Sequence, residues 1–300
     1  MRILHCFKWK AKDIKYNMEN IREQHFDTIL TTPVQPHKEI NMKYYDKEWW
    51  KYYQPLSFNI GNDLCSKQDL IELCNEAHRC RIKIIVDVVL NHVSNKSCGD
   101  DELIPSDDVD SIIKDNKWFF KERRRIMNWD SEYENTHYCP NLPSLNLDNW
   151  ELQDIIKQFL DELIECGVDG FRIDAGKHIG LPRDGISFYE RIIKPYKDSG
   201  KIIMSEVINT NRELIDAYSE YGLVLTNTTD CDHNKIITFA SSHDSELNED
   251  LNMAYTKNLD ESIIMKDYME LTKYYPNTLY FPRKFSSSWL TKEIREANMR

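Results

Sequence analysis

The sequence predicts an α/β fold, a (β/α)8 barrel with one inserted segment. Strand-like and helix-like stretches alternate over residues 1–92 and again over 148–300, as in parallel sheets whose strands are joined by helices. The run at residues 82–90 is almost continuously apolar and β-branched, which is typical of a strand covered on both faces. The chain has 300 residues, somewhat more than the roughly 250 of a typical barrel.

Eight short apolar segments are the expected barrel strands. They lie at residues 2–7, 28–30, 82–90, 168–173, 202–204, 223–225, 236–240 and 278–281. Apolar residues recur at helical spacing between most of them, which predicts connecting helices. These helices are expected at residues 14–24, 66–77, 148–164, 188–197, 211–221 and 262–274.

Capping signals fix the starts of two of these helices, and a short gap argues against another. Ser66 with Asp69, and Asp148 with Glu151, have the spacing of a capping box. Only about ten residues separate the strands at 223–225 and 236–240, too few for a full helix. We therefore expect the sixth helix of the outer ring to be missing or reduced to a single turn, and a long helix between Asn227 and Lys235 would refute this.

The alternation fails over residues 93–147, where charges are dense and aromatic residues are dispersed. This predicts a small irregular subdomain inserted after the third strand, with residues 1–92 and 148–300 forming the barrel. A basic run at residues 121–125 lies in this insertion and is expected to be a solvated face.

The overall charge limits the classes of partner. Lys and Arg number 39 against 50 Asp and Glu, a net charge of -11, which disfavours nucleic acid and anionic membranes. His5 and Lys8 interrupt the first residues before the apolar core of a signal peptide could form, and no apolar run reaches the length of a membrane span. We therefore expect a cytoplasmic protein.

Eight cysteines are scattered without a C-x-x-C pair. This pattern disfavours zinc and predicts free, partly buried thiols rather than disulfides.

Candidate catalytic groups follow four of the expected strands. The strings are residues 87–92 (Asp-Val-Val-Leu-Asn-His), 170–178 (Gly-Phe-Arg-Ile-Asp-Ala-Gly-Lys-His), 205–207 (Ser-Glu-Val) and 241–244 (Ser-Ser-His-Asp). Barrel enzymes place their catalytic groups at the carboxyl ends of the strands. Barrel closure would therefore bring Asp174, Glu206 and Asp244 onto one rim.

The three carboxylates are expected to differ in protonation. Arg172 and Asp174 lie two residues apart on a strand and share a face, so the guanidinium should keep Asp174 ionised. Glu206 lies between apolar Met204 and Val207 and near two other carboxylates, which favours its protonated form. One nucleophilic carboxylate and one carboxylic acid about 5 to 5.5 Å apart are what retaining glycoside hydrolysis requires.

These four strings, in this order, resemble the four signature regions of the α-amylase family of glycoside hydrolases (glycoside hydrolase family 13). The resemblance covers nearly the whole chain. Residues 4–9 resemble the opening strand of the family, residues 49–55 an aromatic glucan-binding stretch, and residues 275–281 the last strand.

The resemblance implies a role for each matching residue. It assigns the nucleophile to Asp174, the general acid/base to Glu206, and to Asp244 the third carboxylate, which holds sugar hydroxyls. Arg172 matches the residue that orients the nucleophile. Contacts to the substrate sugars are implied for Tyr53, Trp49, Trp50, His92, His243, Lys177 and His178. An aromatic ring suits this purpose because the apolar face of a pyranose packs against it.

The resemblance also implies a calcium site that links the insertion to the barrel. Asn91 and the carbonyl of His178 match two of its ligands. Ser144 stands where the family has an aspartate, so we expect calcium to bind weakly or not at all, since calcium prefers carboxylate ligands.

Two other departures concern the whole chain. The sequence ends at Arg300, shortly after the eighth strand, so we expect a short form without the β-sandwich that commonly follows the barrel. Ser242 stands where many relatives have Asn.

Three functions remain open at this point. The first is a retaining hydrolase of α-1,4-glucans or maltooligosaccharides, with no redox cofactor. The second is a transglycosylase or another α-glucosidase on the same fold. The third is an eroded, noncatalytic glucan-binding protein, which the missing helix, sandwich and calcium ligand would favour and the intact carboxylate triad opposes.

Overall fold

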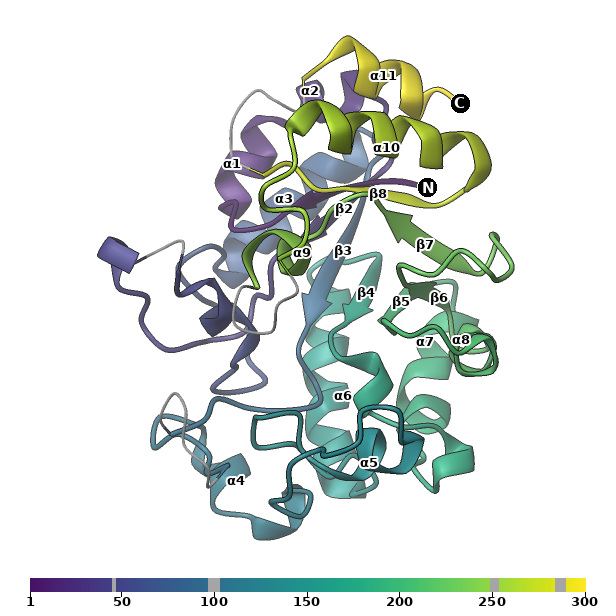
Figure 1. Cartoon of the computed structure of the whole chain (residues 1–300). Coiled ribbons are helices and arrows are strands. Elements are labelled where there is room, and N and C mark those ends of the chain that lie inside the picture. The colour runs from purple at the N-terminus through teal and green to yellow at the C-terminus, as the bar shows by residue number, and fades with distance from the viewer. Residues whose placement is uncertain (45–46, 97–102, 249–253, 284–289) are drawn as a thin grey trace.

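Eight parallel strands close into a barrel in the order β1 to β8 (Figure 1). The computed structural model describes residues 1–44, 47–96, 103–248, 254–283 and 290–300. The strands are β1 (Arg2–Cys6), β2 (Thr28–Thr31), β3 (Lys83–Val88), β4 (Gly170–Ile173), β5 (Ile202–Glu206), β6 (Leu223–Leu225), β7 (Ile236–Phe239) and β8 (Thr278–Tyr280). Pairing of Ile3 with Leu279 joins β1 to β8 and closes the ring. The predicted barrel is confirmed.

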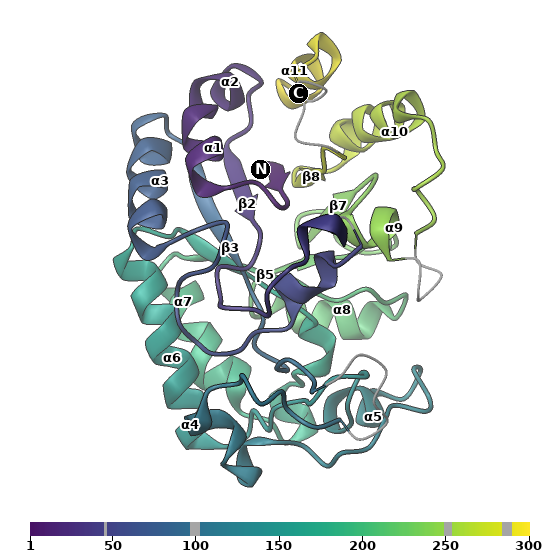
Figure 2. The same ribbon diagram turned by 90° about the vertical axis from the view of Figure 1, so that its left-hand side faces the viewer.

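The helices lie outside this ring or on its loops (Figure 2). The α-helices are α1 (Ala11–Tyr16), α2 (Met18–Glu23), α3 (Lys67–Arg79), α4 (Ser111–Lys114), α5 (Glu132–His137), α6 (Trp150–Glu165), α7 (Lys194–Asp198), α8 (Arg212–Ser219), α9 (His243–Leu247), α10 (Glu261–Tyr274) and α11 (Lys292–Asn298). Shorter turns include the 3-10 helices η2 (Trp49–Tyr53) and η4 (Gly176–His178) and the π-helix η6 (Tyr189–Ile193).

Alternation along each strand divides the core into two parts. Ile3 belongs to a cluster inside the barrel, with Ile85 and Met204, whereas the next residue, Leu4, belongs to the larger cluster between strands and helices. Successive side chains of a strand point to opposite faces, so each strand contributes to both clusters. This explains why the strands are apolar at nearly every position.

Two helix predictions need correction. The helix expected over residues 14–24 begins earlier and breaks at Asn17, whose Nδ2 donates to the carbonyl of Asp13 at 2.9 Å. An asparagine side chain that bonds to nearby backbone competes with the helix. The predicted cap Asp148 is also wrong by one residue. Asn149 caps α6 by accepting from the amide of Leu152, while Asp148 accepts from the amide of Ser187.

Two other local predictions are confirmed. Ser66 and Asp69 form a reciprocal capping box at the start of α3. Residues 226–235 contain no helix, so the connection between β6 and β7 lacks the sixth helix of the ring. In place of this helix, α8 contacts β6 and α10 contacts β7 (Figure 1).

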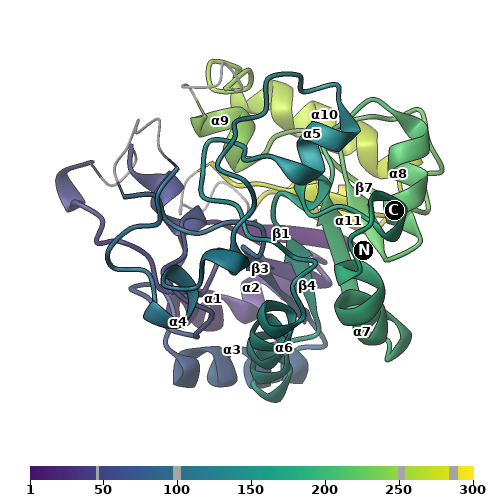
Figure 3. The same ribbon diagram turned by 90° about the horizontal axis from the view of Figure 1, so that it is seen from below.

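The described residues of the segment 93–147 lie beyond the carboxyl end of β3, and Figures 1 and 3 show α4 and α5 at one end of the molecule. Their described part contains only short helices and isolated bridges, such as those joining His92 to Ser144 and Phe120 to Leu145. The expectation of a solvated face fails for Lys121. Its Nζ donates to the carbonyl of His178 at 2.7 Å instead of facing water.

The end of the chain packs close to its beginning. The hydroxyl of Tyr268 on α10 donates to Asn298 Oδ1 on α11 at 2.6 Å, and Asn298 Nδ2 donates to the carbonyl of Gln24 at 2.8 Å.

The cysteines of the described segments are free thiols, six buried and one partly exposed, while Cys98 lies outside the described residues. Within those segments, no helix is both long and apolar enough to cross a membrane.

Candidate active site

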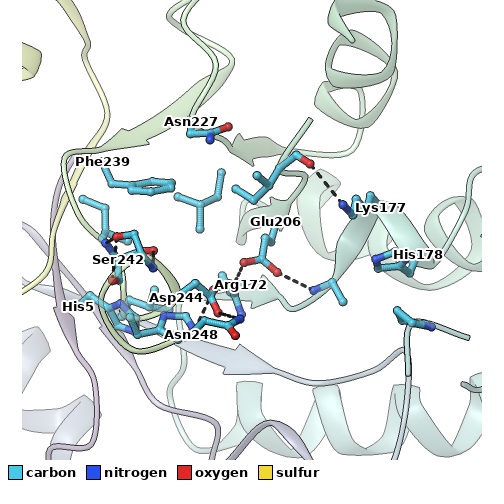
Figure 4. A pocket seen from close by; sticks show the side chains of 18 of the residues that line it. His5, Arg172, Lys177, His178, Glu206, Asn227, Phe239, Ser242, Asp244 and Asn248 are labelled. Carbon is cyan, nitrogen blue, oxygen red and sulfur yellow. Dashed lines mark hydrogen bonds and ion pairs between the residues drawn. The ribbon is translucent and has the colours of Figure 1, made fainter. Parts of the chain in front are cut away.

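A cavity of about 270 Å³ opens at the carboxyl end of the barrel (Figure 4). Of the predicted residues, the cavity is lined by Glu206, Asp244, Arg172, His92, His243, Lys177 and His178. Apolar side chains from the strands, such as Leu30, Leu225 and Phe239, form its inner wall. The predicted convergence of strand ends therefore produces a hollow with charged groups on one side.

Arg172 lies at the centre of the carboxylate cluster. Its Nη1 donates to Asp174 Oδ1 at 2.8 Å and to both oxygens of Asp87 at 2.9 Å, and its Nη2 donates to Glu206 Oε1. The guanidinium is 1% exposed, so it cannot exchange these partners for water. One buried cation thus binds three carboxylates from β3, β4 and β5.

The electrostatics of Asp174 differ from the prediction. Burial raises the pKa of Asp174 well above its ordinary value, and the neighbouring Glu206 and Asp87 raise it further, although Arg172 opposes them. Burial also raises the pKa of Asp87 to about 6. One guanidinium cannot neutralise three buried carboxylates, so the cluster favours retaining a proton.

The expected apolar setting of Glu206 is wrong. Its Oε2 accepts from the amide of Ala175 at 3.0 Å, and its Oε1 accepts from Arg172. Ala175 has a left-handed backbone, with φ of 51°, and this conformation ends β4 just before η4. The turn after β4 therefore fixes the orientation of a side chain on β5.

Asp244 lies in the first turn of α9, which follows β7 after a short loop. Ser242 caps this helix by accepting from the amide of Ser245 at 3.2 Å. His243 Nε2 lies 3.3 Å from Asp244 Oδ2, and burial raises the pKa of Asp244. The side chains of Asp174, Glu206 and Asp244 are 11%, 17% and 26% exposed. Glu206 and Asp244 line the cavity, whereas Asp174 is buried and is not among its lining residues.

The aromatic residues predicted as sugar platforms pack against one another. The ring of His243 stacks on Tyr53 and on Phe7, with centroids 5.0 and 4.8 Å apart. Trp49 meets His243 edge on, and Trp49 and Tyr53 are each 8% exposed. Trp50 is partly exposed, packs against the cluster that contains Trp49 and Tyr53, and has Lys51 Nζ 5.9 Å from its ring.

The remaining predicted sugar contacts surround the cavity. His92 Nε2 donates to the carbonyl of Tyr53 at 2.9 Å and lies 4.0 Å from Asp174 Oδ2, and burial lowers the pKa of His92 to about 4. His178 Nδ1 donates to the carbonyl of Asn135 at 3.0 Å. Lys177 Nζ donates to the carbonyl of Ile208 at 3.4 Å and lies 5.7 Å from the ring of Trp129.

The predicted calcium ligands do not fit a metal ion. Lys121 Nζ lies between two of them, 2.7 Å from the carbonyl oxygen of His178 and 3.4 Å from Asn91 Oδ1. The Ser144 hydroxyl donates to the carbonyl of Leu142 at 3.3 Å. Burial lowers the pKa of Lys121 to about 7. Among the described residues, no three His, Cys, Asp or Glu side chains are grouped to hold a metal.

Sequence reasoning missed several residues of this site. Asp87 accepts from Arg172 and from the hydroxyl of Tyr53 at 2.9 Å. It begins the string at residues 87–92, so its place at a strand end could have identified it. Trp129 and Asn227, which line the cavity, lie in segments without a strand signal, and only the fold places them here.

A parallel barrel with Glu206 and Asp244 at a cavity on its carboxyl end, and with Asp174 joined to Glu206 through Arg172, resembles barrel enzymes that act through carboxylate chemistry. The family model described as "Alpha amylase, catalytic domain" matches residues 11–281. The chain belongs to this family of glycoside hydrolases.

Individual relatives agree with this assignment. The chain is 34% identical over 178 residues to an α-amylase of Clostridium acetobutylicum. The matched region is 59% of this chain and 23% of the relative. It is 33% identical over 235 residues to an α-amylase of Thermomonospora curvata, covering 74% of this chain and 38% of the relative. The chain thus spans well under half of the length of these relatives.

A solved structure shares the fold. The α-amylase of Geobacillus thermoleovorans, determined with acarbose, superposes with a TM-score of 0.75 at 17% identity, covering 99% of this chain and 76% of the other.

Proposed function

We propose that the chain is a retaining α-glycoside hydrolase that acts on α-1,4-glucans or maltooligosaccharides by double displacement. The observation that carries this proposal is the binding of Asp174 and Glu206 to one guanidinium, Asp174 through Nη1 and Glu206 through Nη2. The two carboxylates are thus held beside the same cation, as a nucleophile and an acid/base that act on one glycosidic bond must be.

The proposed reaction uses the carboxylates in sequence. Glu206 donates a proton to the glycosidic oxygen while Asp174 attacks the anomeric carbon, which gives a glycosyl ester and a free leaving sugar. The resulting Glu206 carboxylate then takes a proton from water, and that water releases the sugar from Asp174. Asp244, with His92 and His243, would hold hydroxyl groups of the reacting sugar.

The proton on the carboxylate cluster fits this reaction. Because burial raises the pKa of both Asp174 and Asp87, a proton is available among the groups around Arg172 before substrate binds.

Reducing-sugar release from maltoheptaose tests the proposal. We expect release by the unmodified protein and its loss, by at least about 10³-fold, in Asp174→Asn and in Glu206→Gln. Proton NMR of the first product should show the α-anomer. Equal rates in the protein and both variants would exclude the assignment, transfer to an added sugar acceptor would favour a transglycosylase, and glucan binding without turnover would favour a noncatalytic protein.

A further inference from the structure

Lys121 connects the 93–147 segment to two strand ends of the barrel. Its backbone amide donates to the carbonyl of Ser144 at 2.9 Å, which fixes the residue within the segment. Its side chain reaches out of the segment to Asn91, just after β3, and to His178 in η4, just after β4. One lysine therefore contacts three parts of the chain that are far apart in sequence.

The two oxygens that Lys121 contacts are the ones that the family resemblance assigns to calcium. A calcium ion takes six to eight oxygen ligands, usually with carboxylates among them. Here an amino group is already within hydrogen-bonding distance of the carbonyl of His178, and the third position is a serine whose hydroxyl is bonded to its own loop. A divalent ion would have to displace the lysine and would gain no carboxylate.

We propose that the Lys121 side chain takes the place of a bound divalent cation, and that it attaches the 93–147 segment to the barrel without calcium. A lysine amino group is a suitable replacement because it presents several donors to oxygens arranged around a point. Two differences from the family act together here. Lys121 supplies hydrogen-bond donors to the oxygens, and Ser144 stands in place of the aspartate whose negative charge a metal ion would need.

This attachment also reaches the cavity. The carbonyl that Lys121 binds belongs to His178, whose ring lines the cavity and bonds to Asn135 of the inserted segment. Lys121 is thus a positioning residue, because it acts on the site through His178 and touches no reacting group.

Thermal unfolding of the whole chain, with calcium or with EDTA, tests the proposal without an activity assay. The unmodified protein should have the same Tm in both. Lys121→Met should lower the Tm by about 3 to 6 °C, as expected for the loss of two partly buried hydrogen bonds from a lysine. Lys117→Met, at an exposed lysine four residues away, is the matched control and should leave the Tm within about 1 °C.

A double variant that removes the lysine and restores the aspartate should make the protein depend on calcium. The double variant Lys121→Met with Ser144→Asp restores the carboxylate and removes the lysine, so its Tm should rise with calcium and fall with EDTA. Ser144→Asp alone should stay insensitive to calcium, and this variant serves if Lys121→Met fails to fold. A calcium-dependent Tm in the unmodified protein or in Ser144→Asp, or equal Tm values for Lys121→Met and Lys117→Met, would overturn the proposal.

Discussion

The imidazole of His243 lies parallel to the phenol of Tyr53, with an angle of 5° between the rings and 5.0 Å between their centroids. The resemblance assigns both residues to contacts with the same sugar. In this structure the two rings stack on each other with an offset, so His243 covers part of the Tyr53 face that a sugar could use.

Substitution can separate two functions of Tyr53, the hydrogen bond of its hydroxyl to Asp87 and the proposed stacking of its ring on a sugar. Tyr53→Phe removes the hydroxyl that donates to Asp87 but keeps the ring, whereas Tyr53→Ala removes both. We expect Tyr53→Ala to lower the free energy of unfolding by about 3 to 5 kcal/mol and to raise KM strongly. Tyr53→Phe should cost about 1 to 2 kcal/mol and change KM less. Equal KM values in the two variants, measured with maltoheptaose, would show that the ring is no sugar platform.

Asp87 is expected to set the acid limit of activity. Its negative charge raises the pKa of Asp174, so Asp87→Asn should lower that pKa. Asp174 would then stay ionised to lower pH, and the acid limb of the kcat/KM profile should move down by roughly one pH unit. Asp161→Asn, at a carboxylate on the outer side of α6, is the control. An unchanged acid limb, or a shift to higher pH, would contradict this role for Asp87.

Regular periodicity explains which parts of the fold the sequence predicts. The strands at 2–7 and 82–90 are apolar on both faces, and their order along the chain is enough to propose a barrel. The break at Asn17 depends on one side chain that bonds to the backbone, and a periodic pattern does not reveal it.

The residues of the site likewise fall into those that local sequence patterns predict and those that they do not. Carboxylates at strand ends could be predicted because parallel strands bring their carboxyl ends together. The stack of Tyr53 on His243 and the reach of Lys121 to His178 join segments that are distant in sequence. Such contacts depend on how the loops fold back over the barrel, and no local pattern encodes them.

The backbones of β4 and β5 lie close together at Gly170. A Cβ at this position would lie 2.0 Å from the carbonyl oxygen of Ile202 on β5, so the backbone of one strand would have to move. We expect Gly170→Ala to lower the free energy of unfolding by about 3 kcal/mol or more. Gly185→Ala, where the Cβ meets no atom within 4 Å but φ is +80°, should cost only about 1 kcal/mol. Urea unfolding of both variants checks the difference, and equal losses would mean that β4 and β5 are less closely packed here.

Trp129 should determine how the leaving part of the substrate is held. Trp129 lines the cavity from the 93–147 segment, is 47% exposed, and has Lys177 Nζ 5.7 Å from its ring. If the proposed hydrolase binds sugars across this cavity, an exposed ring on its rim offers a face for stacking. Trp129→Ala should then raise KM for maltoheptaose about tenfold, leave kcat within about twofold, and leave the Tm unchanged.

Substrates of different length test this prediction further. If Trp129 stacks on a sugar of the leaving group, only oligosaccharides long enough to reach it should depend on its ring. The effect of Trp129→Ala on kcat/KM should shrink from maltoheptaose to maltotriose. Trp118→Ala, at a tryptophan that is 69% exposed and lies in the same segment, is the control and should behave like the unmodified protein. The same loss for all substrate lengths, or for both variants, would mean that Trp129 shapes the inserted segment and does not bind sugar.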